Sequence, residues 1–410
     1  MNSSRLIYLD HAATTPLDPR VLEVMQPAFA DTFGNPSSFH TVGLRAKELV
    51  AEARASVARL LHVREDEILF TSGGTEGDNM VVVGIPRAAR VQIRQQCGEE
   101  AKPHVIASAI EHHAVLEPLL SLQKSGEIEL TIVPVDREGL VDVEAIKKAL
   151  QPNTVLVSLM LANNEIGTIQ PVADVGRMLL AWRKERKTAF PYFHSDACQA
   201  AEFLDLNVEP LHVDALVING SKMYGPKGVG VLFLRRGVKL EPLVRGGGQE
   251  RGLRAGTEHV PGIIGLAKAF ELAQAEREDE CVRLTVLRDR LVDGLLQIPK
   301  SRLNGHPTLR LPNSANISFL DIEGEAAVLY LDAEGIMAST GSACASASLD
   351  PSHVILATGL SYEAAHGSLR FTLGHSTTQE DVDRVIEVMP GIVERLRRMS
   401  PTNLDMKYFL

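Results

Sequence analysis

Short apolar runs alternate with longer amphipathic segments between residues 66 and 236. The short runs are rich in β-branched residues and are bounded by glycine and polar residues, which is typical of buried strands. The longer segments, such as residues 141–150 and 172–187, repeat apolar positions with the period of helices that cover a sheet. This alternation predicts βαβ units and a mostly parallel sheet. The candidate strands are residues 66–70, 104–108, 128–135, 154–161, 190–197, 215–219 and 229–235.

The pattern changes after the glycine-rich segment 245–257. Two long amphipathic stretches follow at residues 262–276 and 282–297, and each of them predicts a helix. A short mixture of strands and helices comes next, and it ends in a further predicted helix at residues 379–399. These segments predict a second, smaller α/β unit beside the main sheet.

We therefore expect an α/β protein of two domains, the larger of which contains a seven-stranded, mostly parallel sheet. The chain has 410 residues, of which 45% are apolar, and this is enough to bury two cores. Nothing near residue 260 resembles a flexible linker, so one helix can belong to both domains. The expected division is a large domain at residues 16–260 and a small domain made of residues 1–15 and 261–410.

The charge balance and the length of the apolar runs limit the classes of partner. The chain carries 42 Lys and Arg against 52 Asp and Glu, which gives a net charge of -10. It contains no basic run longer than short pieces such as Arg397-Arg398, so we expect no nucleic acid partner. Its apolar runs are far shorter than the roughly 20 residues that cross a bilayer, so we expect no membrane partner. The first ten residues contain neither a sustained apolar segment nor an Arg-rich one. This favours a cytoplasmic location.

The four cysteines argue for a reactive thiol and against a structural site. Cys97, Cys198, Cys281 and Cys344 are scattered and form no Cys-x-x-Cys pair. Such spacing disfavours both a disulfide framework and a zinc site, so we expect no metal centre.

A loop of small residues at 71–78, Thr-Ser-Gly-Gly-Thr-Glu-Gly-Asp, follows one predicted strand and opens a helix. Small residues let backbone N–H groups approach an anion, and the helix N-terminus adds a favourable dipole, so the loop is a candidate phosphate site. An ordinary βα turn has the same composition, and both interpretations stay open.

Lys222 is a candidate nucleophile because it comes directly after an apolar strand and before a Gly/Pro turn. A lysine at a strand end that is partly removed from water has a lowered pKa and can form a Schiff base with an aldehyde. The alternative is a surface lysine, which is the common state of this residue type.

Two further strand ends carry ionisable groups that belong at the same edge of the sheet as Lys222. Asp196 can pair with a protonated pyridine nitrogen, the pairing that makes a pyridoxal ring an electron sink, or it can simply cap the next helix. His112 or His113 can lie flat on an aromatic cofactor and move protons near neutral pH, or either can be a loop histidine without a role.

Cys344 lies in a stretch of small residues at 339–348. A buried cysteine is the usual case, but nothing bulky in this stretch would cover the thiol. We therefore expect Cys344 to be exposed on a loop, where it can react.

In their order along the chain, these segments resemble the cysteine desulfurases, a branch of the fold-type I pyridoxal-phosphate enzymes. The resemblance covers nearly the whole chain, and it is the order of the motifs, more than any one of them, that is specific. The matching segments are Tyr-Leu-Asp-His-Ala-Ala-Thr-Thr-Pro at 8–16, Gly-Asn-Pro-Ser-Ser at 34–38, Asn-Asn-Glu-Ile-Gly at 163–167, Arg-Gly-Gly-Gly-Gln-Glu-Arg at 245–251 and Ser-Leu-Arg-Phe at 368–371.

The resemblance implies a set of cofactor contacts. Lys222 would form the Schiff base with pyridoxal 5'-phosphate, His112 would stack on the ring and handle protons, and Asp196 would pair with the ring nitrogen. Gln199 and Asn164 would hold the side of the phenolic oxygen. The phosphate would be bound by Gly74, Thr75, Asn219 and Ser221, and by Thr257 of a second subunit, which implies a homodimer.

Two of these phosphate positions depart from the family pattern. The family usually has a histidine immediately before the Schiff-base lysine, where this chain has Ser221, and a serine or alanine two positions earlier, where it has Asn219. Both replacements can donate hydrogen bonds. We therefore expect an altered affinity for the cofactor and not a loss of activity.

The resemblance also implies the substrate and the reaction. Arg370 would bind the carboxylate of L-cysteine, assisted by Asn164 and Asn35, because a planar guanidinium matches a carboxylate. Cys344 would take the sulfur as a persulfide and pass it to an acceptor protein in iron-sulfur cluster assembly or another sulfur pathway, leaving L-alanine. Its loop resembles the longer of the two loop types in the family.

Two other functions remain open at this stage. A selenocysteine lyase is similar in fold, cofactor and most site residues, although the segment 341–348 looks more like the desulfurase loop. A non-catalytic scaffold could keep the fold and serve only in sulfur trafficking. Such a scaffold would be expected to lose at least one of the residues Lys222, Asp196, His112, Arg370 and Cys344, and all of them are present.

Overall fold

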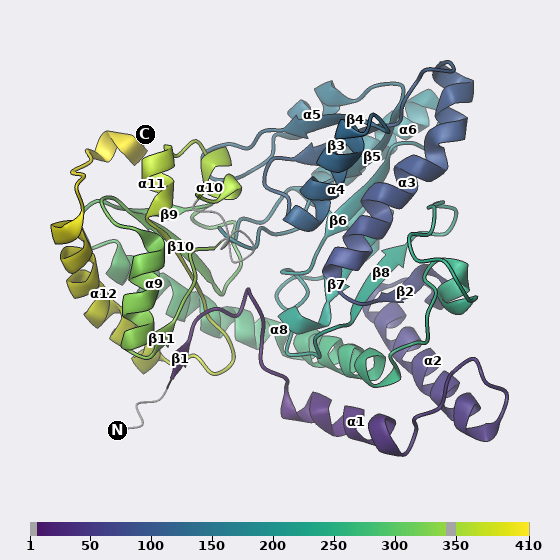
Figure 1. Cartoon of the computed structure of the whole chain (residues 1–410), viewed down its shortest axis with the longest axis horizontal. Coiled ribbons are helices and arrows are strands. Elements are labelled where there is room, and N and C mark those ends of the chain that lie inside the picture. Colours follow the sequence, from purple (N-terminus) through teal and green to yellow (C-terminus); the bar gives the residue numbers. More distant parts are fainter. Residues whose placement is uncertain (1–5, 342–349, 410) are drawn as a thin grey trace.

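The computed structural model describes residues 6–341 and 350–409. A seven-stranded sheet forms the centre of the larger part of the molecule (Figure 1), with the strand order β2-β8-β7-β6-β5-β3-β4. Its strands run parallel except β8, which is antiparallel to both β2 and β7. The predicted α/β fold is confirmed, because every candidate strand is present. The strands are β2 (Ile68–Thr71), β3 (His104–Ser108), β4 (Glu129–Val133), β5 (Thr154–Ser158), β6 (Tyr192–Asp196), β7 (Ala215–Asn219) and β8 (Gly230–Leu234).

Helices cover both faces of this sheet, as the alternating pattern predicted. The helices α3 (Gly74–Cys97) and α4 (His113–Lys124) pack on one face, and their apolar residues form one cluster with the strand residues that point to that side. The opposite face carries a larger cluster that includes α2 (Thr41–Leu61), α5 (Val143–Ala149) and α6 (Val172–Arg186). The strands β3 and β5 are buried along their whole length, since both faces are covered.

A smaller group of elements lies beside the main sheet. The strands β9 (Ser301–Asn304), β10 (Ser314–Phe319) and β12 (Ser368–Thr372) form an antiparallel sheet in the order β12-β10-β9. The strand β1 (Ile7–Tyr8) lies with this group, because it pairs with β11 (Ile336–Met337). The division of the chain at residue 260 stays a prediction. The remaining helices here are α9 (Gly324–Ala333), α10 (His353–Ala357), α11 (Tyr362–His366) and α12 (Gln379–Met399).

The helix α8 (Val260–Leu295) runs along both groups of elements (Figure 1). It packs on α1 (Pro19–Ala30) and α2 at one end and contacts α12 and β10 at the other. The prediction of two helices at 262–276 and 282–297 is wrong, because α8 is continuous. The residues between them, Arg-Glu-Asp-Glu-Cys at 277–281, interrupt the apolar pattern but include neither glycine nor proline, so the backbone continues as a helix.

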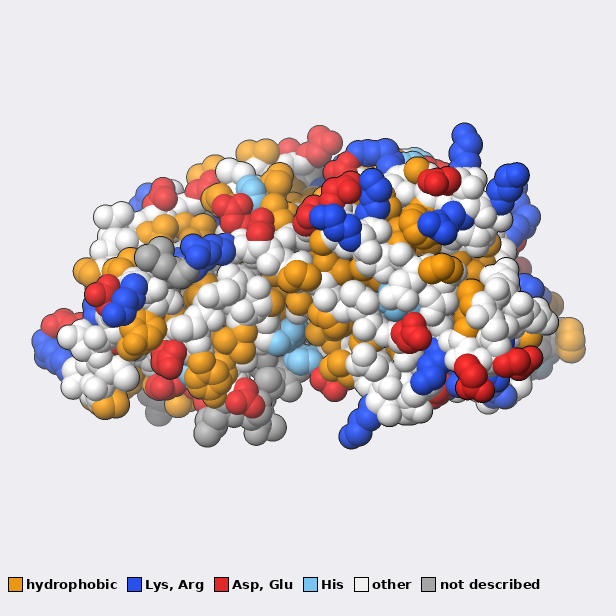
Figure 2. Space-filling view, turned by 90° about the horizontal axis from the view of Figure 1, so that it is seen from above, with side chains coloured by type: hydrophobic (Ala, Val, Ile, Leu, Met, Phe, Trp, Pro, Cys, Tyr) orange, Lys and Arg blue, Asp and Glu red, His pale blue; other side chains and the backbone are white. Residues whose placement is uncertain are grey.

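The surface in Figure 2 carries acidic and basic side chains interspersed with one another on the face shown. Within 6–341 and 350–409, no helix has the length and apolar character needed to cross a membrane.

Candidate active site

The carboxyl ends of several parallel strands surround a cavity of about 290 Å³. In open α/β sheets this edge is where ligands bind, because loops and helix N-termini converge there. Most of the site residues predicted from the sequence line this one cavity. They are Gly74, Thr75, His112, Asn164, Asp196, Gln199, Asn219, Lys222 and Arg370.

Three other predicted site residues, Ser221, Asn35 and Thr257, do not line it. Ser221 lies beside Asn219, whose Oδ1 accepts a hydrogen bond from Ser221 N at 3.2 Å. Asn35 and Thr257 are exposed on this chain, away from the cavity lining. Cys344 lies outside the described residues.

Lys222 ends a short 3-10 helix, Gly220–Lys222, that follows β7. Its Nζ donates hydrogen bonds to the backbone oxygens of Ala12 at 2.8 Å and Ala13 at 2.7 Å. Burial lowers the pKa of this amine from its usual value of 10.5. Neutral carbonyls compensate for burial less than a carboxylate would, so the amine is easier to deprotonate and more nucleophilic.

Asp196 ends β6, makes a local capping contact and lines the cavity. Its Oδ1 accepts a hydrogen bond from Cys198 N at 2.8 Å, which is a turn-capping contact, and the residue also lines the cavity. Its side chain is buried, and it faces a region that also contains Lys222. A cationic ring nitrogen placed in this cavity would supply a charge partner that the cap does not.

His112 is the N-cap of α4, and its Nδ1 accepts a hydrogen bond from Ala114 N at 3.1 Å. Burial lowers the pKa of its imidazole, so the ring is neutral near pH 7. With Nδ1 accepting, the neutral ring carries its proton on Nε2. The neighbouring His113 also lines the cavity, but its ring packs 4.6 Å from the ring of His353.

The predicted phosphate loop has the geometry of an anion cradle. The helix α3 begins at Gly74, so its first N–H groups have no partner within the helix. Gly73 has a φ of 151°, which favours glycine, and a Cβ on Gly74 would lie 2.7 Å from Cys198 Sγ. The side-chain nitrogen Nδ2 of Asn219 would lie 3.7 Å from the same Cβ position. The loop and Asn219 therefore fit a phosphate group at the start of a long helix.

Arg370 belongs to β12, outside the main sheet, and lines the cavity. Its Nη2 donates to Asp10 Oδ1 at 2.7 Å, and its Nη1 donates to the backbone oxygens of Asn164 at 3.0 Å and Gly341 at 3.2 Å. Its Nε has no partner among the described residues. The guanidinium is thus held in one orientation and keeps a donor for a ligand.

Sequence reasoning missed Asp10 and two buried acids at or near the cavity, Asp78 and Glu111. Asp10 belongs to a motif that carried the family resemblance, but nothing local indicates its partner in β12. Asp78 is fully buried, and its Oδ1 lies 3.4 Å from His194 Nε2. Burial raises the pKa of Asp78 well above its usual value and lowers the pKa of His194 to about 4, so the imidazole of His194 is neutral near pH 7.

Glu111 is the second buried acid. Its Oε1 accepts hydrogen bonds from Ser108 Oγ at 2.5 Å and Met160 N at 3.0 Å, and its Oε2 has no partner among the described residues. Burial, helped by the charge of Asp196, raises the pKa of Glu111 from 4.5 to about 7, although both hydrogen bonds oppose the rise. Glu111 is therefore partly protonated at neutral pH.

Replacing Glu111 with glutamine is expected to remove a pH-dependent part of the stability. A raised pKa in the folded state means that this group's contribution is present below about pH 4.5 and is lost as the pH rises through about 7. Between pH 5 and pH 8 this group should cost the wild type about 2–3 kcal/mol of its free energy of unfolding. Urea unfolding at these two pH values should therefore show that Glu111→Gln loses less of its free energy of unfolding than the wild type does. The exposed Glu117→Gln is the control, and equal losses in all three proteins would contradict the prediction.

The described residues on either side of the segment that carries Cys344 contact the cavity wall. On one side, the backbone oxygen of Gly341 is held by Arg370. On the other, Ser352 Oγ donates to Glu165 Oε2 at 2.5 Å, and His353 Nε2 lies 3.0 Å from the backbone oxygen of Glu111. The described residues that flank positions 342–349 therefore lie at the cavity that contains Lys222.

Comparisons with known proteins agree over nearly the full chain. The sequence profile of the family described as aminotransferase class-V matches residues 7–385. A relative named cysteine desulfurase IscS, from Methanosarcina thermophila, is 49% identical over 398 residues, which cover 97% of this chain and 94% of the relative. The solved structure of a NifS-like protein has a TM-score of 0.85 at 37% identity, covering 96% of this chain and 99% of that chain. The structure of SspA in complex with cysteine has a TM-score of 0.75 at 32% identity, covering 90% and 98%.

Proposed function

The chain belongs to the aminotransferase class-V family and is a cysteine desulfurase, and from this premise we propose that Lys222 binds pyridoxal phosphate while Cys344 receives the sulfur of L-cysteine. Enzymes of this family depend on pyridoxal phosphate. One observation carries the assignment: the amine of Lys222, with its lowered pKa, opens into the cavity that also holds Asp196, His112 and the anion cradle at Gly74.

Different cavity residues would bind different parts of this cofactor. When bound, pyridoxal phosphate supplies an electron sink for bonds to the substrate's α-carbon. Asp196 would keep the ring nitrogen charged, and His112 would lie against the ring. The N–H groups of Gly74 and Thr75, with the Asn219 side chain, would bind the phosphate. Asn164 and Gln199 would stand on the phenolic side, where Gln199 is already oriented by a hydrogen bond from its Nε2 to Ala12 O at 2.9 Å.

Lys222 and Cys344 are the proposed reacting groups of the chain. The ε-amine of Lys222 takes the α-proton of the substrate, since burial has lowered its pKa. The thiolate of Cys344 attacks the substrate sulfur: an S–S bond forms, the carbon–sulfur bond breaks, and its electron pair stays with carbon. Protonation of that carbon gives L-alanine and leaves a persulfide on Cys344. A persulfide is consumed when an acceptor thiol or a reductant attacks its outer sulfur.

The direct test is an assay with purified enzyme and L-cysteine. We expect alanine in each turnover, sulfide only when a reductant is present, and one persulfide per chain without it. Alanine formation without any protein-bound sulfur would contradict the role of Cys344. Running L-selenocysteine in parallel measures the preference between sulfur and selenium.

Replacing Arg370 with lysine is expected to raise the KM for L-cysteine by roughly 10- to 100-fold. Lysine cannot present two donors to a carboxylate, and charge-assisted hydrogen bonds contribute about 1.5–3 kcal/mol. Steady-state kinetics on alanine formation measure the effect, with Arg290→Lys, which changes an exposed pair with Asp383, as the control. An unchanged KM would place the substrate carboxylate elsewhere.

We further propose that the enzyme is a cytoplasmic homodimer in which Thr257 of one subunit contacts the phosphate bound by the other. Thr257 is exposed on the isolated chain, so its side chain is available to a second subunit. Sedimentation of the purified protein at several concentrations tests the dimer.

Persulfide transfer to a thiol protein is the proposed fate of the sulfur.

A further inference from the structure

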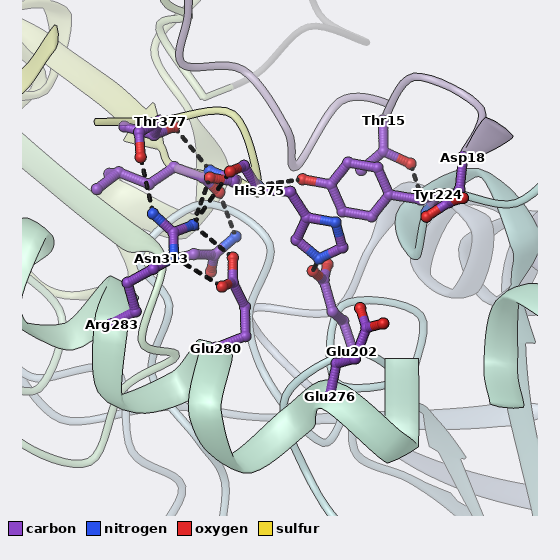
Figure 3. Close-up of polar contacts among 12 residues, drawn as sticks. Thr15, Asp18, Glu202, Tyr224, Glu276, Glu280, Arg283, Asn313, His375 and Thr377 are labelled. Atoms are coloured by element: carbon purple, nitrogen blue, oxygen red, sulfur yellow. Dashed lines mark hydrogen bonds and ion pairs between the residues drawn. The ribbon is translucent and has the colours of Figure 1, made fainter. Parts of the chain in front are cut away.

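Figure 3 shows a second polar cluster, whose residues do not line the cavity. We call His375, Glu202 and Tyr224 the His375 cluster. The rings of His375 and Tyr224 are stacked, with centroids 3.7 Å apart and planes 11° from parallel. His375 N donates to the Tyr224 hydroxyl at 2.8 Å, and His375 Nε2 lies 3.0 Å from Glu202 Oε1.

Helix α8 holds the turn that presents His375. Arg283 donates to the backbone oxygens of Gly374 at 2.9 Å and Thr377 at 2.7 Å, and its guanidinium is itself fixed by Glu280. The approach is close, because a Cβ on Gly374 would lie 2.3 Å from the Tyr224 hydroxyl. His375 therefore has little freedom to move relative to Tyr224.

The cluster connects three segments that each carry a cavity residue. Tyr224 comes two residues after Lys222, His375 five residues after Arg370, and Glu202 three residues after Gln199. No member of the cluster lines the cavity itself. Its contacts instead join the backbone around Lys222 to the strand end of β12 and to the turn after β6.

Tyr224 also fixes the segment that supplies the partners of Lys222. Its N donates to Thr15 Oγ1 at 2.8 Å, and its O accepts from Asp18 N at 3.0 Å. Ala12 and Ala13, which come three and two residues before Thr15, carry the carbonyls that accept hydrogen bonds from Lys222 Nζ. The φ of Tyr224 is 58°, a left-handed value that is costly for a tyrosine and needs such surrounding contacts to persist.

The charges in the cluster are complementary. The Glu202 side chain is 6% exposed and that of His375 is 32% exposed, so a buried carboxylate faces a partly solvated imidazole. Burial opposes protonation of His375, but Glu202 and the carboxylates behind it raise its pKa above 6.5, so the ring is readily charged. A charged ring gives Glu202 the partner that a buried carboxylate requires. The charged or titratable groups that act on His375, Glu202 or Tyr224 come from two segments, the residues before α1 and helix α8: His11, Asp18, Glu276, Glu280, Cys281 and Arg283.

We propose that the His375 cluster positions Lys222: the His375–Glu202 pair clamps Tyr224 and thereby keeps the amine of Lys222 against Ala12 and Ala13. The inference rests on the proposed role of Lys222 in binding pyridoxal phosphate. His375 touches neither the cofactor site nor the substrate site, so it acts through Tyr224 and is a positioning residue. Its loss should change proton transfer by Lys222 more than it changes the binding of the substrate carboxylate by Arg370.

The test compares His375→Gln with His366→Gln in the enzyme loaded with pyridoxal phosphate. His366 offers a matched control because it also lies near a glutamate, Glu323, packs on a tyrosine, Tyr362, and has a side chain that is 25% exposed. The first measurement is the pH midpoint of the absorbance of the bound cofactor, which requires no turnover. The second is the separate determination of kcat and KM for L-cysteine.

For His375→Gln we expect the absorbance midpoint to move up by about half a pH unit or more, because a less confined Lys222 nitrogen is better solvated. We expect kcat to fall about 10-fold and KM to change less than about 2-fold, the split expected for a misplaced proton-transfer group. Glu202→Gln keeps a hydrogen-bonding side chain without the charge and should give a smaller shift in the same direction. His366→Gln should match the wild type.

Each alternative result has a distinct meaning. A His375→Gln enzyme with the wild-type midpoint and kcat would overturn the positioning role while leaving the function of Lys222 intact. If His375→Gln does not fold, Glu202→Gln and Tyr224→Phe decide, and wild-type midpoints in both would also overturn it. A wild-type chain that shows no cofactor absorbance would overturn the proposed function together with this inference.

Discussion

Lys222→Ala enzyme is expected to lose the visible absorbance of bound pyridoxal phosphate and to form alanine at least about 10³-fold more slowly than the wild type. The side chain is proposed both to hold the cofactor covalently and to move the α-proton, and general acid–base catalysis alone contributes about 10²- to 10⁴-fold. Spectra after dialysis and an alanine assay measure the two losses.

Lys227→Ala is the matched control for this experiment. Lys227 also donates from its Nζ to a backbone oxygen of the same N-terminal segment, that of Thr15, but it does not line the cavity. We expect this variant to keep both the absorbance and the turnover. A Lys222→Ala enzyme that desulfurates cysteine at the wild-type rate would end the assignment of the site.

Cys344→Ala enzyme is expected to keep the cofactor and to respond to cysteine with an absorbance change, but to form at most about one thousandth of the wild-type protein-bound persulfide. The reason is that burial suppresses the reactivity of the thiols of Cys198 and Cys281, while Cys97 does not line the cavity. Cys198 lines the cavity, but burial raises the pKa of its thiol well above 9.0, so it stays protonated and unreactive. Burial also raises the pKa of Cys281.

Two cysteine variants control this result. Cys198→Ala tests the thiol that is nearest to the cavity residues, and Cys97→Ala tests the exposed thiol at the end of α3. Both should form persulfide normally, as measured by mass spectrometry of the intact chain. Persulfide on Cys344→Ala together with its loss from Cys198→Ala would move the sulfur acceptor into the cavity wall.

These expectations rest on protonation states that come from burial and not from residue type. Lys222 has a lowered pKa and Cys198 a raised one, although they line the same cavity, because burial disfavours the charged form of each. Burial likewise raises the pKa of Asp78, which lines the same cavity, and lowers the pKa of His194 to about 4, so His194 is neutral near pH 7. The cavity floor therefore carries fewer charges than a count of its acids and bases would suggest.

Much of the fold followed from local patterns. The seven strands, the helices α3, α5 and α6 and the C-terminal helix α12 were predicted, because apolar periodicity and glycine or proline breaks report on local structure. The apolar run at 154–161 extends beyond β5, which ends at Ser158, since the residues that follow are buried without being part of the ladder. The continuous helix α8 was missed because a change in polarity was taken for a break in the backbone.

The sequence by itself determined which residue types stand at the strand ends, and parallel topology then requires Asp196, Asn219 and the loop before α3 to share one edge of the sheet. Only the tertiary structure decided that Arg370 pairs with Asp10, that Lys222 lies on the carbonyls of Ala12 and Ala13, and that His375 meets Glu202 and Tyr224. The physical reason is that these contacts join residues far apart in the chain, and their charges depend on how completely the whole fold excludes water. Neither the distance between such residues nor their burial is written in a local pattern.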